Sequence, residues 1–153
     1  FLSASVIGLF ENALDKIVAL AILLTIVPSM GGIAGSQTLT LVIRGLALGQ
    51  LGSSNFNSLV RKEISVGLIN GLLWAAVVAA FTILWFEDFK LAWIIALSLI
   101  INLLAGAYAG AIIPVLLKRI GVDPALAGSV VLTTFTDVIG ILAFLGMATL
   151  FLL

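Results

Sequence analysis

The chain has 153 residues, of which 63% are hydrophobic and only 9% are charged, whereas soluble domains usually contain roughly 25% charged residues. Lysine and arginine balance aspartate and glutamate, so the chain lacks the basic surface that a nucleic-acid binder needs. Cysteine and histidine are absent from the sequence, which excludes a disulfide framework, thiolate or imidazole metal sites and a Ser-His-Asp triad within it. The composition indicates an all-α protein that crosses the lipid bilayer several times.

Five membrane-spanning helices are expected in chain order. Residues 1–10 are apolar but short, and they are interpreted as the end of an incomplete first helix. Residues 13–49 are too long for one straight span, and the Gly-rich segment 28–35 predicts that this second helix is broken there. Three further stretches provide the roughly 20 apolar residues that a span requires, namely residues 64–86, 91–117 and 124–153.

Charged residues between the spans set the expected orientation. Arg61 and Lys62 make the predicted loop 50–63 basic, and the loop 118–123 also carries basic residues. Because the basic side of a membrane protein is usually cytoplasmic, both loops are expected in the cytoplasm and the C-terminus outside. The expected location is therefore the cell (inner) membrane, with several passes. Asp123 before a proline is typical of a helix N-cap.

Asp137 lies deep inside the last expected span, about 21 Å along the helix from Asp123. A carboxylate at that depth is costly and by default marks a functional site, although it could instead be a protonated group that hydrogen-bonds a neighbouring helix. The same helical face carries further small or polar residues, namely Ser129, Thr133, Thr136 and Gly140. This stripe favours the wall of a water-filled path.

The second helix offers a similar face after the Gly-rich segment. Ser36 and Thr40 are four residues apart, and Gln37 lies beside Ser36. Gln37 and Thr40 could equally serve hydrogen bonds between helices. In the fourth span, Asn102, Gly106 and Gly110 recur every four residues, which predicts close helix packing rather than a pore lining.

The available ligands are hard oxygen donors, which suit Mg²⁺, Mn²⁺ or Ca²⁺. One aspartate supplies a single negative charge, whereas a divalent cation prefers two. A two-fold dimer would place two copies of Asp137 around its axis. With so few protein ligands the ion should keep much of its water, which favours Mg²⁺.

At these residues the sequence resembles the MgtE family of magnesium channels. Segment 31–47 resembles the second transmembrane helix of that family, segments 121–127 and 133–140 resemble its final helix, and the resemblance covers essentially the whole chain. It implies a homodimer of five-helix protomers, with a pore at the dimer axis where Asp137 of both chains binds hydrated Mg²⁺. The other implied metal-site positions are Thr133, Ser129, Ser36 and Thr40, and the implied pore-lining positions are Gly32, Gly35, Gln37, Thr136 and Gly140.

The chain departs from the family at two levels. The family usually has Asn at the positions of Ile33, Ser36 and Ser129, which bears on the choice among Mg²⁺, Mn²⁺ and Ca²⁺. The cytosolic N-terminal and CBS domains of the family are absent from residues 1–153. These residues are therefore expected to form a single transmembrane ion-conducting domain.

The preferred interpretation is a passive Mg²⁺ channel. The alternative is a Na⁺- or H⁺-coupled Mg²⁺ carrier, because broken helices also occur in carriers. An intramembrane enzyme is not expected, since an aspartyl protease needs two acids in the membrane and a Ser-His protease needs histidine. A structural subunit without a pore would leave the Asp137 stripe unexplained. No small-molecule substrate other than the ion is expected.

Overall fold

A computed structural model describes the chain except for Ser53, which falls in the predicted loop 50–63, and the side chain of Lys16. The regular elements of the described residues are all helices: α1 (Leu2–Gly8), α2 (Glu11–Lys16), α3 (Val18–Leu23), α4 (Ile26–Ala47), α5 (Phe56–Phe86), α6 (Phe89–Arg119) and α7 (Pro124–Leu152). Four runs are long and apolar enough to cross a membrane, namely α3 with α4, α5, α6 and α7. With 7 residues, α1 is only about 10 Å long, so a fifth spanning helix stays a prediction.

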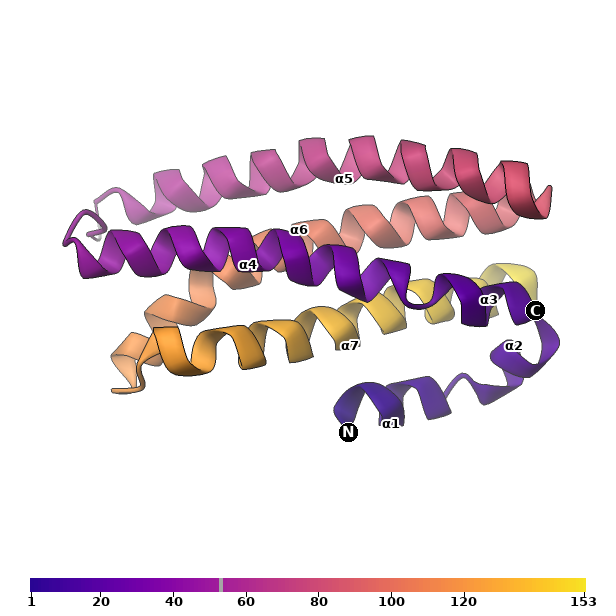
Figure 1. Cartoon of the computed structure of the whole chain (residues 1–153), viewed down its shortest axis with the longest axis horizontal. Coiled ribbons are helices and arrows are strands. Elements are labelled where there is room, and N and C mark those ends of the chain that lie inside the picture. The colour runs from indigo at the N-terminus through magenta and orange to yellow at the C-terminus, as the bar shows by residue number, and fades with distance from the viewer. Residues whose placement is uncertain (53) are drawn as a thin grey trace.

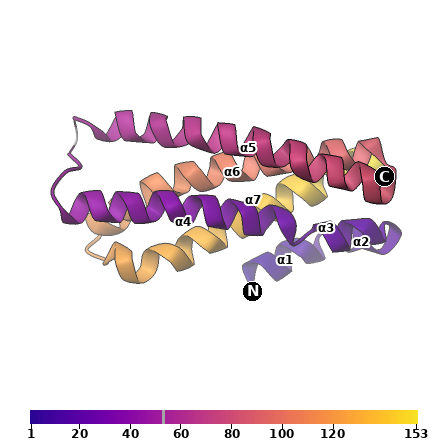
Figure 2. The same cartoon turned by 45° about the horizontal axis from the view of Figure 1, so that its top comes forward.

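Helix α6 is the centre of the bundle. It packs against α4, α5 and α7, while α1 packs against α7. Figures 1 and 2 show α5 along one side of α6 and α7 along the other. Because α6 has neighbours on three sides, it is the most buried of the four long runs.

Glycines allow α4 and α6 to lie unusually close. A Cβ atom on Gly35 of α4 would lie 2.9 Å from the carbonyl oxygen of Gly106 of α6, and a Cβ on Gly110 would collide with the carbonyl oxygen of Gly35. Small residues four apart on both helices permit this approach of the two backbones. The packing role predicted for Gly106 and Gly110 is confirmed.

The prediction that the second helix is broken at residues 28–35 is wrong. Helix α4 runs through this segment without interruption, and the gap in the helix lies at Leu24 and Thr25, between α3 and α4. Pro28 has no N–H to donate to the Leu24 carbonyl, and its ring crowds that carbonyl. The helix is therefore disturbed one turn before the proline, while the glycines that follow are supported by α6.

The connections on the basic side are shorter than predicted. Helix α5 begins at Phe56, so Arg61 and Lys62 lie in its first turns and not in a loop. Charged residues of this kind are good helix formers, and the helix continues beyond its apolar part. Glu63 accepts a hydrogen bond of 2.9 Å from the Thr38 hydroxyl, which joins α5 to α4. The α4–α5 and α6–α7 connections lie at the same end of the bundle, opposite the C-terminus (Figure 1).

The N-cap predicted at Asp123 is confirmed. Its carboxylate accepts a hydrogen bond of 2.9 Å from the backbone N–H of Ala125, and Pro124 is the first residue of α7. The proline has no N–H to leave unsatisfied at this position. These two residues therefore fix where α7 starts, and with it the depth of Asp137.

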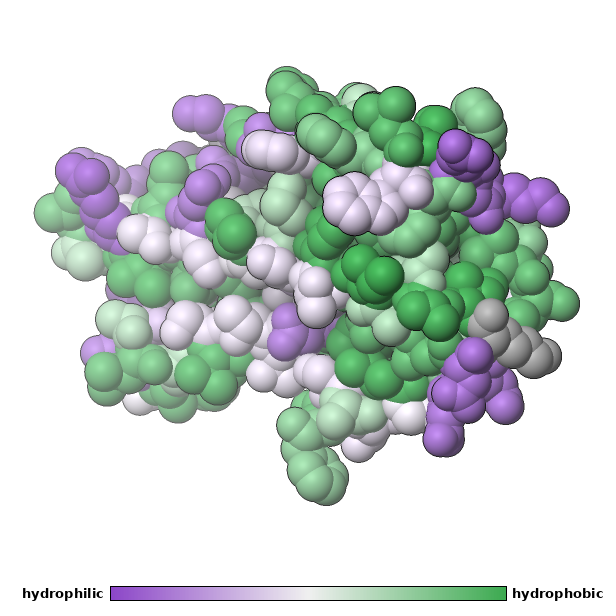
Figure 3. Space-filling view, turned by 45° about the vertical axis from the view of Figure 1, so that its right-hand side comes forward, coloured by the Kyte–Doolittle hydropathy of each residue, from purple (hydrophilic) through white to green (hydrophobic). Residues whose placement is uncertain are grey.

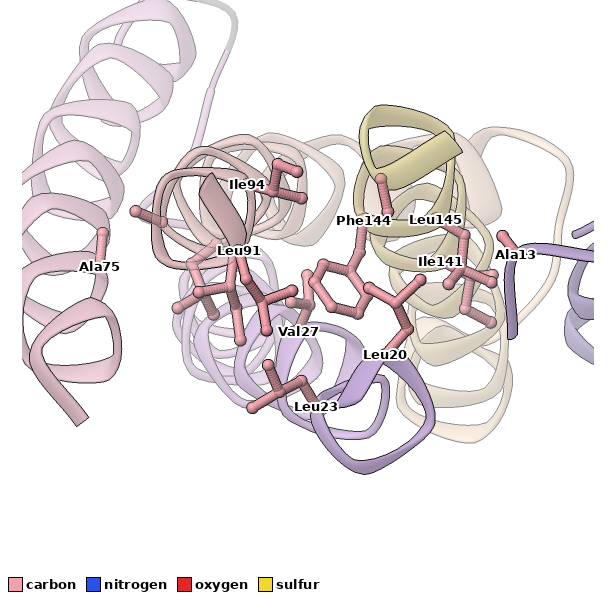
Figure 4. Packing of buried hydrophobic residues seen from close by; sticks show 14 of the residues in the cluster. Ala13, Leu20, Leu23, Val27, Ala75, Leu91, Ile94, Ile141, Phe144 and Leu145 are labelled. Carbon is pink, nitrogen blue, oxygen red and sulfur yellow. The ribbon is translucent and has the colours of Figure 1, made fainter. Parts of the chain in front are cut away.

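A hydrophobic cluster holds α7 against α3 and α4. Phe144 of α7 is fully buried and points toward Leu20 and Val27 in Figure 4. Large apolar side chains are exposed along every long helix. In Figure 3 they gather mainly on the right of the face, residues of intermediate hydropathy run from the centre to the left, and most hydrophilic residues lie toward the ends. Such a surface suits contact with lipid.

Candidate functional site

An open groove of about 710 Å³ runs between α4 and α7. Most of its lining comes from one face of α4, where polar residues and a glycine recur at helical spacing, and α7 contributes an acid and a hydroxyl. The lining residues are Pro28, Ser29, Gly32, Ile33, Ser36, Gln37, Thr40, Thr133 and Asp137. The groove therefore brings together the two polar faces that the sequence predicted separately.

Asp137 is the acidic residue of the groove. It lies near the middle of α7 and is half-buried. Across the described residues, no group of three or more acidic, histidine or cysteine side chains is close enough to hold a metal ion. The groove thus offers a single carboxylate, and its lining also carries hydroxyl and amide groups.

Three hydroxyl groups of the groove, those of Ser36, Thr40 and Thr133, present acceptors rather than donors. Ser36 donates to the Gly32 carbonyl at 2.8 Å, and Thr40 donates to the Ser36 carbonyl at 2.8 Å. Thr133 of α7 donates to the Ser129 carbonyl at 2.9 Å. Because each of these three hydroxyl protons is used within its own helix, the oxygen lone pairs are left for the groove. Lone pairs and a carboxylate suit a cation or the water molecules around it.

Six of the predicted site residues line this groove, namely Asp137, Thr133, Ser36, Thr40, Gly32 and Gln37. The other four lie elsewhere. Ser129 is exposed one turn before Thr133 and is not part of the lining.

Gly35, Thr136 and Gly140 are buried where helices meet. Gly35 faces α6, and a Cβ on Gly140 would lie 2.7 Å from the Asn102 side chain. The Thr136 hydroxyl donates to the carbonyls of Leu132 and Thr133, at 3.2 and 3.1 Å. These three residues pack behind the groove and do not face it.

Sequence reasoning missed Ser29, Pro28 and Ile33 as groove residues. Ser29 is exposed one turn after the gap between α3 and α4. A signal was present, because residues 29, 33, 36 and 40 recur at the spacing of one helical face. The prediction of a break over segment 28–35 hides this spacing, because helical periodicity does not apply across a break.

Comparison with known proteins identifies the family. The model of the MgtE family, described as a divalent cation transporter, matches residues 24–147. The chain belongs to the MgtE family. The resemblance found in the sequence is confirmed, and the four long apolar helices are those of a multi-pass membrane protein of this family.

Curated relatives from three bacteria carry the name magnesium transporter MgtE. The chain is 34% identical to the Bacillus subtilis protein over 99% of its own length and 33% identical to the Thermus thermophilus protein over 98%. It is 27% identical to the Enterococcus faecalis protein over 98%. The chain spans about one third of the length of each of these MgtE proteins.

Proposed function

We propose that this chain is the ion-conducting transmembrane domain of a passive Mg²⁺ channel. Two copies would meet so that their α4–α7 grooves face each other and form one pore. In that pore, Asp137 of both chains would hold a hydrated Mg²⁺, with Ser36, Thr40 and Thr133 accepting hydrogen bonds from its water. The observation that carries the proposal is the groove itself, in which one half-buried acid lies among acceptor oxygens.

The number of ligands supports a hydrated ion and a second copy. Mg²⁺ gives up its water reluctantly and is often held by one or two carboxylates. One protomer supplies one carboxylate in the groove, and two-fold symmetry would supply the second. Mn²⁺ and Ca²⁺ use the same oxygen ligands, so selectivity would depend on the size and hydration of the ion rather than on ligand type.

The ends of the bundle support an orientation. Arg44 lies in the last turn of α4, Lys118 and Arg119 lie in the last turn of α6, and Arg61 and Lys62 lie in the first turns of α5. These helix ends adjoin the α4–α5 and α6–α7 connections, which lie at one end of the bundle (Figure 1). The C-terminus lies at the opposite end. By the positive-inside rule the basic end would be cytoplasmic and the C-terminus outside, in the cell membrane.

Mg²⁺ entry into liposomes that contain a trapped Mg²⁺-sensitive dye tests this proposal. The reconstituted chain should pass Mg²⁺ down its gradient with no Na⁺ or H⁺ gradient present. Asp137→Ala should lower the rate by tenfold or more, because losing a charged partner of a bound cation costs more than about 1.4 kcal/mol. Asp15→Ala is the matched control, since Asp15 is an exposed acid of α2 outside the groove.

Two results would contradict the proposal. A protein that is silent until a Na⁺ or H⁺ gradient is imposed would be a coupled carrier. Equal rates for wild type and Asp137→Ala would mean that Asp137 only holds helices together and does not contact the ion.

A further inference from the structure

Asn102 lies in the middle of α6, and its side chain is fully buried. Its amide nitrogen donates a hydrogen bond of 2.7 Å to the carbonyl of Val27, a residue of α4 that lies 75 positions earlier in the chain. Its amide oxygen is buried and has no hydrogen-bond partner among the described residues. The bond reaches α4 directly before Pro28, at the end of the groove where Ser29 lies.

The Asn102 amide lies between α4 and α7, the two helices that form the groove. A Cβ atom on Gly31 of α4 would collide with this amide, and a Cβ on Gly140 of α7 would lie 2.7 Å from its nitrogen. Gly31 precedes the groove residue Gly32, and Gly140 follows Asp137 by three residues, or about 4.5 Å along the helix. The amide therefore lies behind the groove, close to the height of Asp137.

Packing alone does not require an amide at this position. An unpaired buried carbonyl oxygen is costly, and an apolar side chain would fill the space without leaving one. Ser98, one turn earlier on α6, is also fully buried, but it donates to the Ile94 carbonyl of its own helix at 2.7 Å. Asn102 instead donates to the Val27 carbonyl of α4, and its amide lies next to Gly140 of α7. Its contacts therefore link the two walls of the groove.

We infer that Asn102 is a positioning residue of the ion site. Its amide fixes the separation of α4 and α7, and this separation determines how far Asp137 stands from Ser36 and Thr40 across the groove. A hydrated Mg²⁺ and a hydrated Ca²⁺ differ in size and rigidity, so discrimination between them depends on that width. The inference deepens the proposed function and rests on it for this last step.

The test measures groove width and selectivity separately. The sequence has no cysteine, so spin labels attach only to introduced cysteines, here at the exposed Leu41 of α4 and Val131 of α7. Labelled protein is diluted with unlabelled protein so that only distances within one chain are measured. Asn102→Ala should shift this distance by about 1–2 Å, the size of helix shifts at repacked interfaces, and lower the Mg²⁺/Ca²⁺ flux ratio severalfold. Ser98→Ala, the matched control, should change neither.

A second variant acts on the same contact from α7. Gly140→Ala pushes a methyl group against the Asn102 amide, and it should also change the distance and lower the flux ratio. The double variant Gly140→Ala with Asn102→Ala should recover part of the wild-type label distance and flux ratio, because the amide that the new methyl group meets is gone. Gly146→Ala is its control, since a Cβ there meets nothing within 4 Å.

The outcomes separate the two proposals. An unchanged distance and flux ratio in folded Asn102→Ala, or in Gly140→Ala, would overturn the inference even if the wild type conducts Mg²⁺. A wild type that passes no Mg²⁺ would instead refute the channel, while the label distances would still show whether Asn102 sets the width.

Discussion

The direction of hydroxyl protons decides what the groove can hold. Thr133 and Thr134 are adjacent on α7, and both donate to carbonyls of the preceding turn, at 2.9 and 2.8 Å. Thr133 lines the groove and Thr134 does not. The two residues therefore share chemistry and local structure but differ in access to an ion, which makes them a matched pair.

Replacing Thr133 by valine keeps the shape of the side chain and removes its acceptor oxygen. Thr133→Val should lower the Mg²⁺ flux about three- to tenfold, as expected for the loss of one hydrogen bond to a water of the hydrated ion. Thr134→Val should leave the flux unchanged, and the liposome assay measures both. Similar losses in the two variants would indicate a general effect on α7 and not contact with the ion.

For single residues, the sequence predicts well which ones share a helical face, but it predicts poorly which of them face the groove and which pack against other helices. The periodicity of Thr133 and Asp137 correctly predicts that both line one groove, whereas Ser129 on the same helical face lies outside it. A face about 100° wide includes both a groove side and a packing side, so periodicity could not separate Asp137 from Thr136 or Gly140. That separation depends on α4 and α6, whose contacts come from distant parts of the chain.

The helices owe their arrangement to a few small residues. On α6, a Cβ at Gly106 would collide with the carbonyl of Gly31 on α4, whereas Gly146 of α7 has open space around it. The first glycine is needed for close approach, and the second only lowers helix propensity. The fold therefore depends on the α4–α6 contact, which also supports the groove from behind.

Gly106→Ala should destabilise the protein by about 1–3 kcal/mol, because overpacking forces the two backbones apart. Gly146→Ala should instead stabilise it by about 0.5–1 kcal/mol through better helix propensity. Unfolding in detergent, followed by circular dichroism, measures both. A Gly106→Ala variant as stable as the wild type would show that the two helices are not in such close contact.

The residues at which helices begin and end are harder to predict than the presence of the membrane-spanning helices. The predicted spans 64–86, 91–117 and 124–153 match α5, α6 and α7, because apolar runs of this length have few alternatives. The start of α5 at Phe56 was missed, since hydropathy detects the part of a helix in lipid and not its polar extension. The disturbance lies before Pro28 and not after it, because a proline acts on the carbonyl four residues earlier.

At the scale of the whole molecule, the α4–α7 groove is open on one side and has one acid in its lining, Asp137. This asymmetry is why the proposed site requires a second copy. If two Asp137 side chains share an ion, the site should bind about one ion per two chains. The number of protomers could not be derived from the sequence pattern, because an open polar face does not say what covers it.

Binding of Mn²⁺, followed by its paramagnetic resonance signal, gives the stoichiometry. The difference in bound Mn²⁺ between the wild type and Asp137→Asn should be about one ion per two chains. A difference of one ion per chain would mean that each groove acts alone, and the shared site would be wrong.

The most direct test of the central claim asks whether the ion passes along the groove. The cysteine-free chain allows Ser29→Cys, at a groove position, to be compared with Val131→Cys, at an exposed position outside it. A membrane-impermeant, charged thiol reagent should stop Mg²⁺ flux through Ser29→Cys, and high Mg²⁺ should slow this block. It should leave Val131→Cys conducting. If Ser29→Cys is modified and still passes Mg²⁺ at the wild-type rate, the groove between α4 and α7 is not the ion path.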